Sequence, residues 1–230
     1  MARLKKGKFC PKCGSPRVYW PVPQIPQMKC KDCGWQGILV VEDGELAKTI
    51  RSEWESKEDT KKLKDLLIDH GAVQFGRFKL TSGKESDYYV DIKQVSTAPD
   101  VLKHIAKLIV PYTEGYDCLA AMELGAVPIE VAVSLASGKP YVIIRKEERG
   151  HGTLKKVEGP SVDKKKILVI EDVTTTGGTI VTAAKALRGN GAEVREAIVV
   201  VDREEGAAKK LKEEGIKLIP LVSISELKEK

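Results

Sequence analysis

Apolar residues beyond residue 60 of this chain fall into short continuous runs separated by more polar segments. The clearest runs, each of strand length, are Ile167-Leu168-Val169-Ile170 and Ile198-Val199-Val200-Val201. Continuous runs of this kind are typical of parallel strands that are buried on both faces. Segments that predict strands and segments that predict helices follow one another along this part of the chain. The pattern therefore indicates an α/β fold with a parallel sheet flanked by helices, whose ligands bind beyond the carboxyl ends of the strands.

Turn and capping residues place the individual elements. A helix is expected to start at Asp59 or Thr60 and to end at Gly71, and a Ser82-Gly83-Lys84 turn predicts a hairpin. Strands are expected at residues 73–81, 88–92, 118–122, 141–144, 167–170, 193–201 and 217–222. Helices are expected at residues 99–110, 127–135 and 178–187, with a Lys/Glu-rich helix between the last two strands.

The first 43 residues differ in composition from the rest of the chain. They contain four of the five cysteines, five of the eleven prolines and two of the three tryptophans. Residues 44–59 are polar and charged, and good helix formers follow Gly44 without a further Gly or Pro. We therefore expect a small module at residues 1–43, a helical connector at residues 44–59 and the α/β domain at residues 60–230.

The small module carries two Cys-x-x-Cys-Gly motifs, sixteen residues apart, whose cysteines are Cys10, Cys13, Cys30 and Cys33. The glycine after each pair lets the backbone curl around a metal held by both thiolates. Four thiolates favour tetrahedral Zn²⁺, and the motif resembles a zinc ribbon. A rubredoxin-like iron site has the same ligands, so iron stays open here. The fifth cysteine, Cys118, lies in an apolar stretch and is expected to be an inert core thiol.

Positive charge is concentrated in the same module. The chain has a formal net charge of +6, and residues 1–43 hold eight Lys or Arg against three Asp or Glu. Such a module is a solubilising surface, a protein-docking surface or a nucleic acid contact. The residues available for nucleic acid are Lys5, Lys6, Lys8, Arg17, Lys29 and Lys31, beside Trp20 and Trp35. Since the sequence has neither a membrane-spanning apolar run nor a signal-peptide pattern, a soluble cytoplasmic protein is expected.

The strongest chemical signal follows the apolar run at residues 167–170. Two acids and a Thr/Gly loop come next and open a predicted helix: Glu171, Asp172, Val173, Thr174, Thr175, Thr176, Gly177, Gly178 and Thr179. The helix N-terminus and threonine hydroxyls suit a phosphate, whereas carboxylates suit sugar hydroxyls. A sugar phosphate is therefore the expected ligand. The segment resembles the phosphoribosyl pyrophosphate loop of the type I phosphoribosyltransferases.

A second constellation, Arg145-Lys146-Glu147-Glu148-Arg149-Gly150-His151-Gly152, directly follows a predicted strand. Cationic groups spaced by glycines suit a lid that closes over pyrophosphate and excludes water from an oxocarbenium-like transition state. The motif resembles the catalytic loop of orotate phosphoribosyltransferases. Two further segments are similar to that family, the hairpin at residues 78–89 and Val201-Asp202-Arg203-Glu204-Glu205-Gly206. The resemblance runs from about residue 60 to the C-terminus and omits the ribbon.

This resemblance implies roles for individual residues. Arg145, Lys146, Arg149 and His151 would bind pyrophosphate oxygens, and the last three would be catalytic through charge stabilisation. Residues 171–179 would hold the ribose 5-phosphate. Thr175 and Arg203 would contact orotate, whose carboxylate a guanidinium recognises well. An ordinary ion pair with Glu204 or Glu205 is the alternative role for Arg203.

The family resemblance also implies that Mg²⁺ is a cofactor of the reaction, in addition to the Zn²⁺ expected in the ribbon. It further implies a homodimer in which each lid serves the active site of the neighbouring subunit. This chain departs from the family pattern at Thr81, Leu124 and Arg149, which leaves the number of pyrophosphate contacts open, with Lys79 and Lys84 as candidates to compensate.

The implied activity is transfer of phosphoribose from phosphoribosyl pyrophosphate to orotate, which gives orotidine 5′-monophosphate in pyrimidine (UMP) biosynthesis. One alternative is a phosphoribosyltransferase for another base. The other is a regulator that senses phosphoribosyl pyrophosphate and binds nucleic acid through the ribbon. The presence of Lys146, Arg149 and His151 favours an enzyme.

Overall fold

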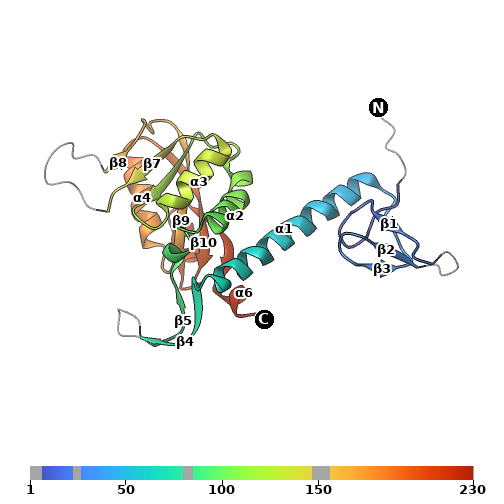
Figure 1. Ribbon diagram of the computed structural model, residues 1–230. Helices are drawn as coiled ribbons and strands as arrows, with labels where there is room; N and C mark the ends of the chain where they lie inside the picture. Colours follow the sequence, from blue (N-terminus) through green and yellow to red (C-terminus); the bar gives the residue numbers. More distant parts are fainter. Residues whose placement is uncertain (1–6, 23–26, 80–84, 147–155, 230) are drawn as a thin grey trace. The chain divides into compact units, whose positions relative to one another are not determined.

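The computed structural model describes residues 7–22, 27–79, 85–146 and 156–229 (Figure 1). The chain divides into two units, residues 1–62 and residues 63–230, and the division falls inside helix α1 (Gly44–Asp69). Each unit has its own buried cluster of side chains.

The first unit contains a three-stranded antiparallel sheet of β1 (Val18–Tyr19), β2 (Met28–Cys30) and β3 (Gln36–Gly37), in that order. Its core is very small and is built around cysteine. The side chains that pack against the buried Cys10, Cys13 and Cys30 are those of Val18, Cys33, Trp35 and Trp54.

Helix α1 is one continuous helix of 26 residues. The prediction of a new helix that starts at Asp59 or Thr60 is wrong, because α1 passes through both residues without a break. Residues with high helix propensity surround these two positions, so their preference for helix starts is overridden. An ion pair of 2.6 Å between Arg51 and Glu55, one turn apart, supports the exposed face. Asp43 caps the N-terminus by accepting two backbone N–H groups.

The second unit is built on a six-stranded sheet in the order β11-β10-β9-β6-β7-β8. Its strands are β6 (Cys118–Met122), β7 (Tyr141–Ile144), β8 (Val157–Glu158), β9 (Lys166–Thr174), β10 (Glu193–Asp202) and β11 (Lys217–Ser223). All neighbouring pairs are parallel except β7 and β8. The predicted parallel sheet is confirmed, and β8 is an antiparallel edge strand that the sequence did not predict.

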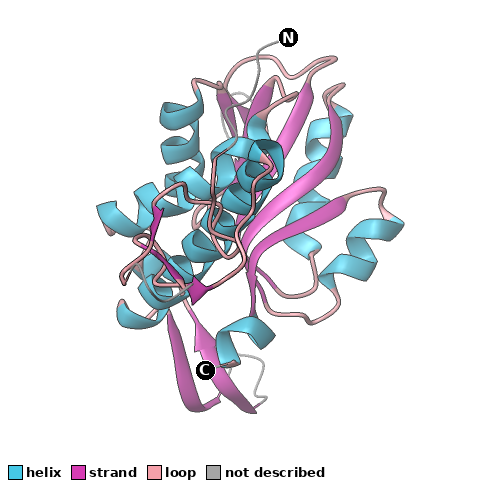
Figure 2. Cartoon of the chain, turned by 90° about the vertical axis from the view of Figure 1, so that its right-hand side faces the viewer, coloured by secondary structure: helices cyan, strands magenta, loops and turns pink. Residues whose placement is uncertain are grey.

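Helices cover both faces of this sheet, as Figure 2 shows. One face packs against α2 (Pro99–Ile109) and α3 (Val127–Ser137), and the other packs against α4 (Gly178–Gly189) and α5 (Ala207–Glu213). Within β9, Leu168 and Ile170 belong to the first cluster and Ile167 and Val169 to the second. Alternate side chains of β9 are therefore buried on opposite faces, which is why the run is continuously apolar.

Smaller elements complete the second unit. The predicted hairpin is present as β4 (Val73–Lys79) and β5 (Glu85–Val90), which pair antiparallel. Two 3₁₀ helices (Ile92–Gln94 and Val110–Thr113) and a short C-terminal helix α6 (Ile224–Lys228) were not predicted. Thr81 and Lys84 lie outside the described residues. No described helix has the length and apolarity needed to cross a membrane.

One ionisable side chain is fully buried in α3. Glu130 has no exposed surface, and neither of its carboxyl oxygens makes a hydrogen bond within the described residues. Burial raises the pKa of Glu130 to about 9. A buried carboxyl group of this kind is held neutral in the folded protein.

Replacing Glu130 with Gln should flatten the pH dependence of stability. The pKa of about 9 in the folded protein lies above the ordinary value of 4.5, so the folded state binds this proton more tightly than the unfolded state does. The free energy of unfolding therefore falls as pH rises between these two values, by up to about 1.4 kcal/mol per pH unit. Urea unfolding followed by circular dichroism across this range measures the slope for each protein.

The matched control is Glu213→Gln, because Glu213 is an exposed glutamate of α5. We expect this variant to keep the slope of the original protein. Equal slopes for the original protein and Glu130→Gln would contradict the assignment of this proton to Glu130.

Candidate active site

The end of β9 and the start of α4 form the centre of the candidate site. β9 continues past the predicted end at residue 170 to Thr174, so Glu171 and Asp172 lie inside the strand rather than after it. Pairing with β10 extends to Thr174, which explains the longer strand. The loop at residues 175–177 then leads into α4.

Gly177 makes the tight turn into α4 possible. Its φ of 76° is left-handed, a conformation that glycine adopts without strain. A Cβ at this position would also lie 3.2 Å from Cγ of Leu211 on α5. The backbone N–H groups of the first turn of α4 have no acceptor within the helix. The turn therefore aims a helix N-terminus, with Thr175, Thr176 and Thr179 around it, at the edge of the sheet.

The two acids in β9 have different environments. Glu171 is buried, whereas Asp172 is half-buried. The Asp172 backbone N–H donates to Glu171 Oε1 at 3.1 Å, and the Val173 N–H donates to Asp172 Oδ1 at 2.9 Å. Burial and the neighbouring Asp172 raise the pKa of Glu171 to about 9. Glu171 is therefore held neutral at neutral pH.

The turn between β6 and α3 closes against this acid pair. A Cβ at Gly125 would overlap the carboxylate of Asp172, so a larger residue here would force that side chain to move. Glu123 Oε1 in the same turn accepts the backbone N–H of Lys146 at 2.8 Å. Leu124, between them, is 71% exposed. The ends of β6, β7 and β9 thus meet at one edge of the sheet.

Two of the four predicted pyrophosphate ligands are described by the structure. Lys146 lies at the end of β7, beside Glu123. The Arg145 backbone N–H donates to Lys156 O at 2.9 Å, and its guanidinium Nη1 is 4.0 Å from Glu158 Oε1 on β8. Arg145 Nε is buried without a hydrogen-bond partner in the described part of the chain. Arg149 and His151 lie outside the described residues.

Arg203 follows β10 and lies next to the phosphate loop. Its backbone N–H donates to Thr174 O at 3.0 Å, and its side chain is 16% exposed. The guanidinium Nη2 is 2.7 Å from Glu205 Oε1, and Nε donates to the Tyr88 hydroxyl at 3.4 Å. The ion pair with Glu205, one of the two partners considered from the sequence, is therefore present.

Sequence reasoning did not name Tyr88, Glu205, Glu123 or Gly125 as site residues. Tyr88 donates its hydroxyl to Glu205 Oε1 at 3.2 Å, which brings the β4–β5 hairpin to the end of β10. Tyr88 and Glu205 both lie within the motifs that resemble the family, so these motifs could have identified them as site residues. Nothing in the sequence indicated that Gly125 contacts Asp172.

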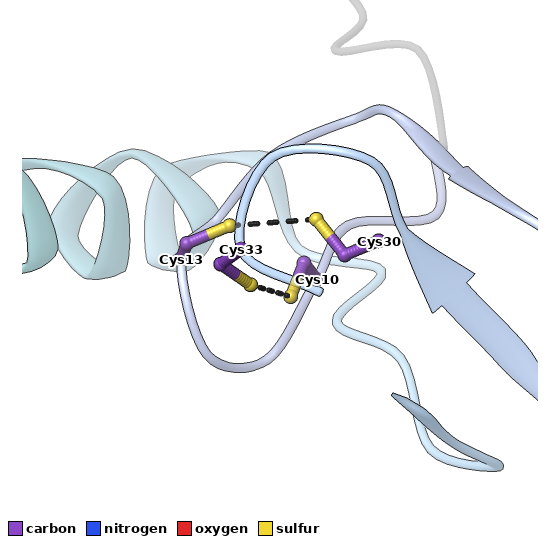
Figure 3. Close-up of side chains that lie close together, drawn as sticks. All are labelled: Cys10, Cys13, Cys30 and Cys33. Carbon is purple, nitrogen blue, oxygen red and sulfur yellow. Dashed lines mark hydrogen bonds between the residues drawn. The ribbon is translucent and has the colours of Figure 1, made fainter. Parts of the chain in front are cut away.

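A second site lies in the first unit, where the four cysteine sulfurs are within 4.8 Å of one another. Sγ of Cys10 is 3.6 Å from Sγ of Cys33, and Sγ of Cys13 is 3.6 Å from Sγ of Cys30 (Figure 3). This arrangement could bind zinc. Cys118 stands apart from the cluster; it is buried in the second unit, and burial raises its pKa to about 11, in keeping with an inert thiol.

Comparisons with known proteins agree with this geometry. Residues 91–221 match the phosphoribosyl transferase domain family. The chain is 52% identical over 174 residues to an orotate phosphoribosyltransferase of Pyrococcus horikoshii, a match that covers 72% of this chain and 94% of the relative. It is 50% identical over 171 residues to that of Methanothermobacter thermautotrophicus, covering 74% and 95% of the two chains.

Solved structures show the same fold. The crystal structure of Mycobacterium tuberculosis orotate phosphoribosyltransferase in complex with Fe(III) dicitrate superposes with a TM-score of 0.66 at 33% identity, over 74% of this chain and 99% of the other. That of orotate phosphoribosyltransferase from Aeropyrum pernix gives 0.65 at 31% identity, over 72% and 95%. The fold and the site therefore define a type I phosphoribosyltransferase. Within that class the chain belongs to the orotate phosphoribosyltransferases, enzymes of pyrimidine biosynthesis.

Replacing Gly125 with Ala should impair catalysis. The added Cβ would overlap the Asp172 carboxylate and displace it. Overpacking of this kind costs about 1–3 kcal/mol, and a loss of about 1.4 kcal/mol in the transition state lowers kcat/KM tenfold. A cost of this size in the transition state corresponds to a fall of about 5- to 150-fold in kcat/KM for orotate, measured by the loss of orotate absorbance.

The control is Gly189→Ala at the end of α4, where a Cβ meets no atom within 4 Å. Alanine is favoured over glycine in a helix, so this variant should keep full activity and equal or higher stability. Full activity of Gly125→Ala would show that the position of Asp172 is not constrained by the turn.

Proposed function

We propose that this chain transfers phosphoribose to orotate at the carboxyl edge of its sheet, where β9 and α4 bind the sugar phosphate and β10 and the β4–β5 hairpin bind the base. The observation that carries this assignment is the 3.0 Å hydrogen bond from the Arg203 N–H to Thr174 O. It joins the residue suited to a carboxylate directly to the strand that leads into the phosphate loop.

The phosphate of phosphoribosyl pyrophosphate binds at the N-terminus of α4. The free N–H groups of the first helical turn and the helix dipole attract the anion, and threonine hydroxyls add donors. Asp172 accepts hydrogen bonds from the ribose hydroxyls, while Glu171, protonated by virtue of its raised pKa, both donates and accepts. These two roles keep the sugar ring at a fixed distance from the phosphate loop.

Orotate binds through Arg203 and Thr175. In the structure the Arg203 guanidinium is paired with Glu205, with Nη2 2.7 Å from Oε1, and the Tyr88 hydroxyl contacts both side chains. The orotate carboxylate takes the place of the Glu205 carboxylate at this guanidinium. Uracil lacks a carboxylate and cannot do so, which accounts for selection of orotate.

Pyrophosphate is neutralised by cations after β7. Lys146 is held at the sheet edge through Glu123, and Arg145 lies next to it. Arg149 and His151 take part on the strength of the family resemblance alone. Their role is charge stabilisation of the departing pyrophosphate, since a closed and charged site disfavours capture of the oxocarbenium-like centre by water.

Mg²⁺ accompanies phosphoribosyl pyrophosphate in this proposal. The carboxyl oxygens of Asp172 and Glu171 would act on the ion indirectly, by accepting hydrogen bonds from ribose hydroxyls or from water. The ion supplies positive charge to the pyrophosphate leaving group. The enzyme is further proposed to be a cytoplasmic homodimer in which each lid serves the neighbouring subunit, as the family resemblance implies.

Zn²⁺ is the proposed occupant of the cysteine cluster. Both motifs fold alike, because the Gly14 N–H donates to Cys10 O at 2.8 Å and the Gly34 N–H donates to Cys30 O at 3.2 Å. Each turn uses a left-handed glycine, with φ of 63° and 69°. Two matched turns that bring four thiols together fit a tetrahedral structural zinc site.

Replacing Arg203 with Ala should reduce kcat/KM for orotate by about 10- to 100-fold, because a charged hydrogen-bonded contact contributes about 1.5–3 kcal/mol. The KM for phosphoribosyl pyrophosphate should change far less, since the phosphate loop is untouched. Steady-state kinetics with each substrate varied in turn separate the two effects. The control is Arg195→Ala, whose side chain is 76% exposed. Unchanged orotate kinetics in Arg203→Ala would remove this residue from the base site.

Replacing Cys13 with Ser should abolish zinc binding without stopping catalysis. The cluster belongs to the first unit and the phosphoribosyl site to the second, so the small cysteine-centred core is lost while turnover stays within about threefold. Elemental analysis should find one zinc per chain in the original protein and none in the variant. Cys118→Ala is the control and should retain zinc. Iron, recognised by its visible absorbance, would contradict the zinc assignment.

A further inference from the structure

The first unit carries exposed aromatic and basic residues, on and beside its small sheet, that have no role in the proposed reaction. In the register of this sheet, Tyr19 pairs with Lys29 and Lys29 pairs with Gln36. The adjacent row, Val18 and Cys30, packs into the cysteine core. Since alternate residues of a strand point to opposite faces, Tyr19, Lys29 and Gln36 form a row on the face away from the cysteines.

Two consecutive aromatic rings on this unit are exposed. Tyr19 is 40% exposed and Trp20 is 49% exposed. Each has a lysine over its ring, with Lys31 Nζ 5.4 Å from the Tyr19 centroid and Lys8 Nζ 4.4 Å from the Trp20 centroid. Neither ring belongs to the buried core of the unit, so packing does not explain them.

In the part of the chain that the structure describes, no carboxylate pairs with the lysines around these rings. Within the described residues, Lys8, Lys29 and Lys31 form no ion pair. The nearby Asp32 is already paired with two arginines, Arg17 and Arg51. We call Tyr19, Trp20, Lys8, Lys29 and Lys31 together the aromatic and basic surface; it offers lysine charges next to exposed aromatic rings.

We propose that this aromatic and basic surface binds single-stranded nucleic acid, with bases stacked on Tyr19 and Trp20 and phosphates held by the three lysines. Single strands present both of the groups that the surface suits, since unpaired bases stack on aromatic rings and the backbone carries regular negative charge. Duplexes hide their base faces, and an acidic polypeptide has the charge without the bases. The interleaving of cations and rings thus favours a single strand over either of these partners.

The test uses the full-length, zinc-loaded enzyme and a fluorescein-labelled oligouridylate of about ten nucleotides, a typical length for such surfaces. Fluorescence anisotropy gives the dissociation constant as the salt concentration is varied. Three lysine–phosphate contacts predict that the logarithm of the binding constant falls with the logarithm of salt with a slope of about −2. Oligothymidylate should bind similarly, whereas duplexes and polyglutamate should compete poorly.

Variants separate stacking from charge. Tyr19→Ala and Trp20→Ala should each weaken binding about tenfold, and Trp20→Phe should restore most of it. Lys29→Ala should reduce the magnitude of the salt slope by about 0.7. Zinc content and orotate turnover should stay unchanged in all four, which shows that the unit remains folded. Matched controls are Tyr112→Ala, an aromatic residue 43% exposed in the second unit, and Lys57→Ala on α1.

Loss of affinity in Lys29→Ala but not in the aromatic variants, or equal competition by polyglutamate, would overturn the proposal in favour of an acidic protein partner. Absence of binding by the zinc-loaded protein at low salt would overturn it outright. Because orotate turnover is measured on the same samples, failure of this proposal is distinguished from failure of the catalytic assignment.

Discussion

The position of strand β9 is the constraint on which the active site depends. Its apolar half is buried between helices on both faces, and its other half carries the acid pair. Pairing with β10 on one side and β6 on the other fixes its register. The same pairing brings Arg203, at the end of β10, to Thr174, and Gly125, in the β6–α3 turn, to Asp172. Burial of the apolar half of β9 therefore fixes the positions of the polar residues at its carboxyl end.

Burial also sets the chemistry of the acids themselves. Two adjacent carboxyl groups next to a phosphate would repel it if both were charged. Desolvation of Glu171, reinforced by the charge of Asp172, keeps one of them neutral. In the proposed site, a neutral Glu171 can donate a hydrogen bond to a sugar hydroxyl, while the more exposed residues of the loop meet the phosphate.

Much of the second unit could be predicted from the sequence. Buried parallel strands have continuous apolar sequences, and the motifs that resemble the family follow these strands directly. The confirmed family, the parallel sheet and the hairpin all rest on such signals. Features set by tertiary contact could not be predicted. The two-residue strand β8 has no periodicity to detect, and Asp59 and Thr60 have the residue types of helix caps although α1 passes through them. Likewise, nothing in the sequence indicated that Glu130 of α3 is buried in the interior.

The pairing of Arg203 with Glu205 has a consequence for ligand discrimination. A guanidinium that is only 16% exposed would be costly without a partner, and the internal carboxylate spares the empty enzyme that cost. If Arg203 binds the base as proposed, an incoming carboxylate would have to displace Glu205, a tethered carboxylate whose effective concentration is high. A simple carboxylic acid, which offers a charge and no further contacts, would then bind more weakly than a carboxylate attached to a ring that fits the site.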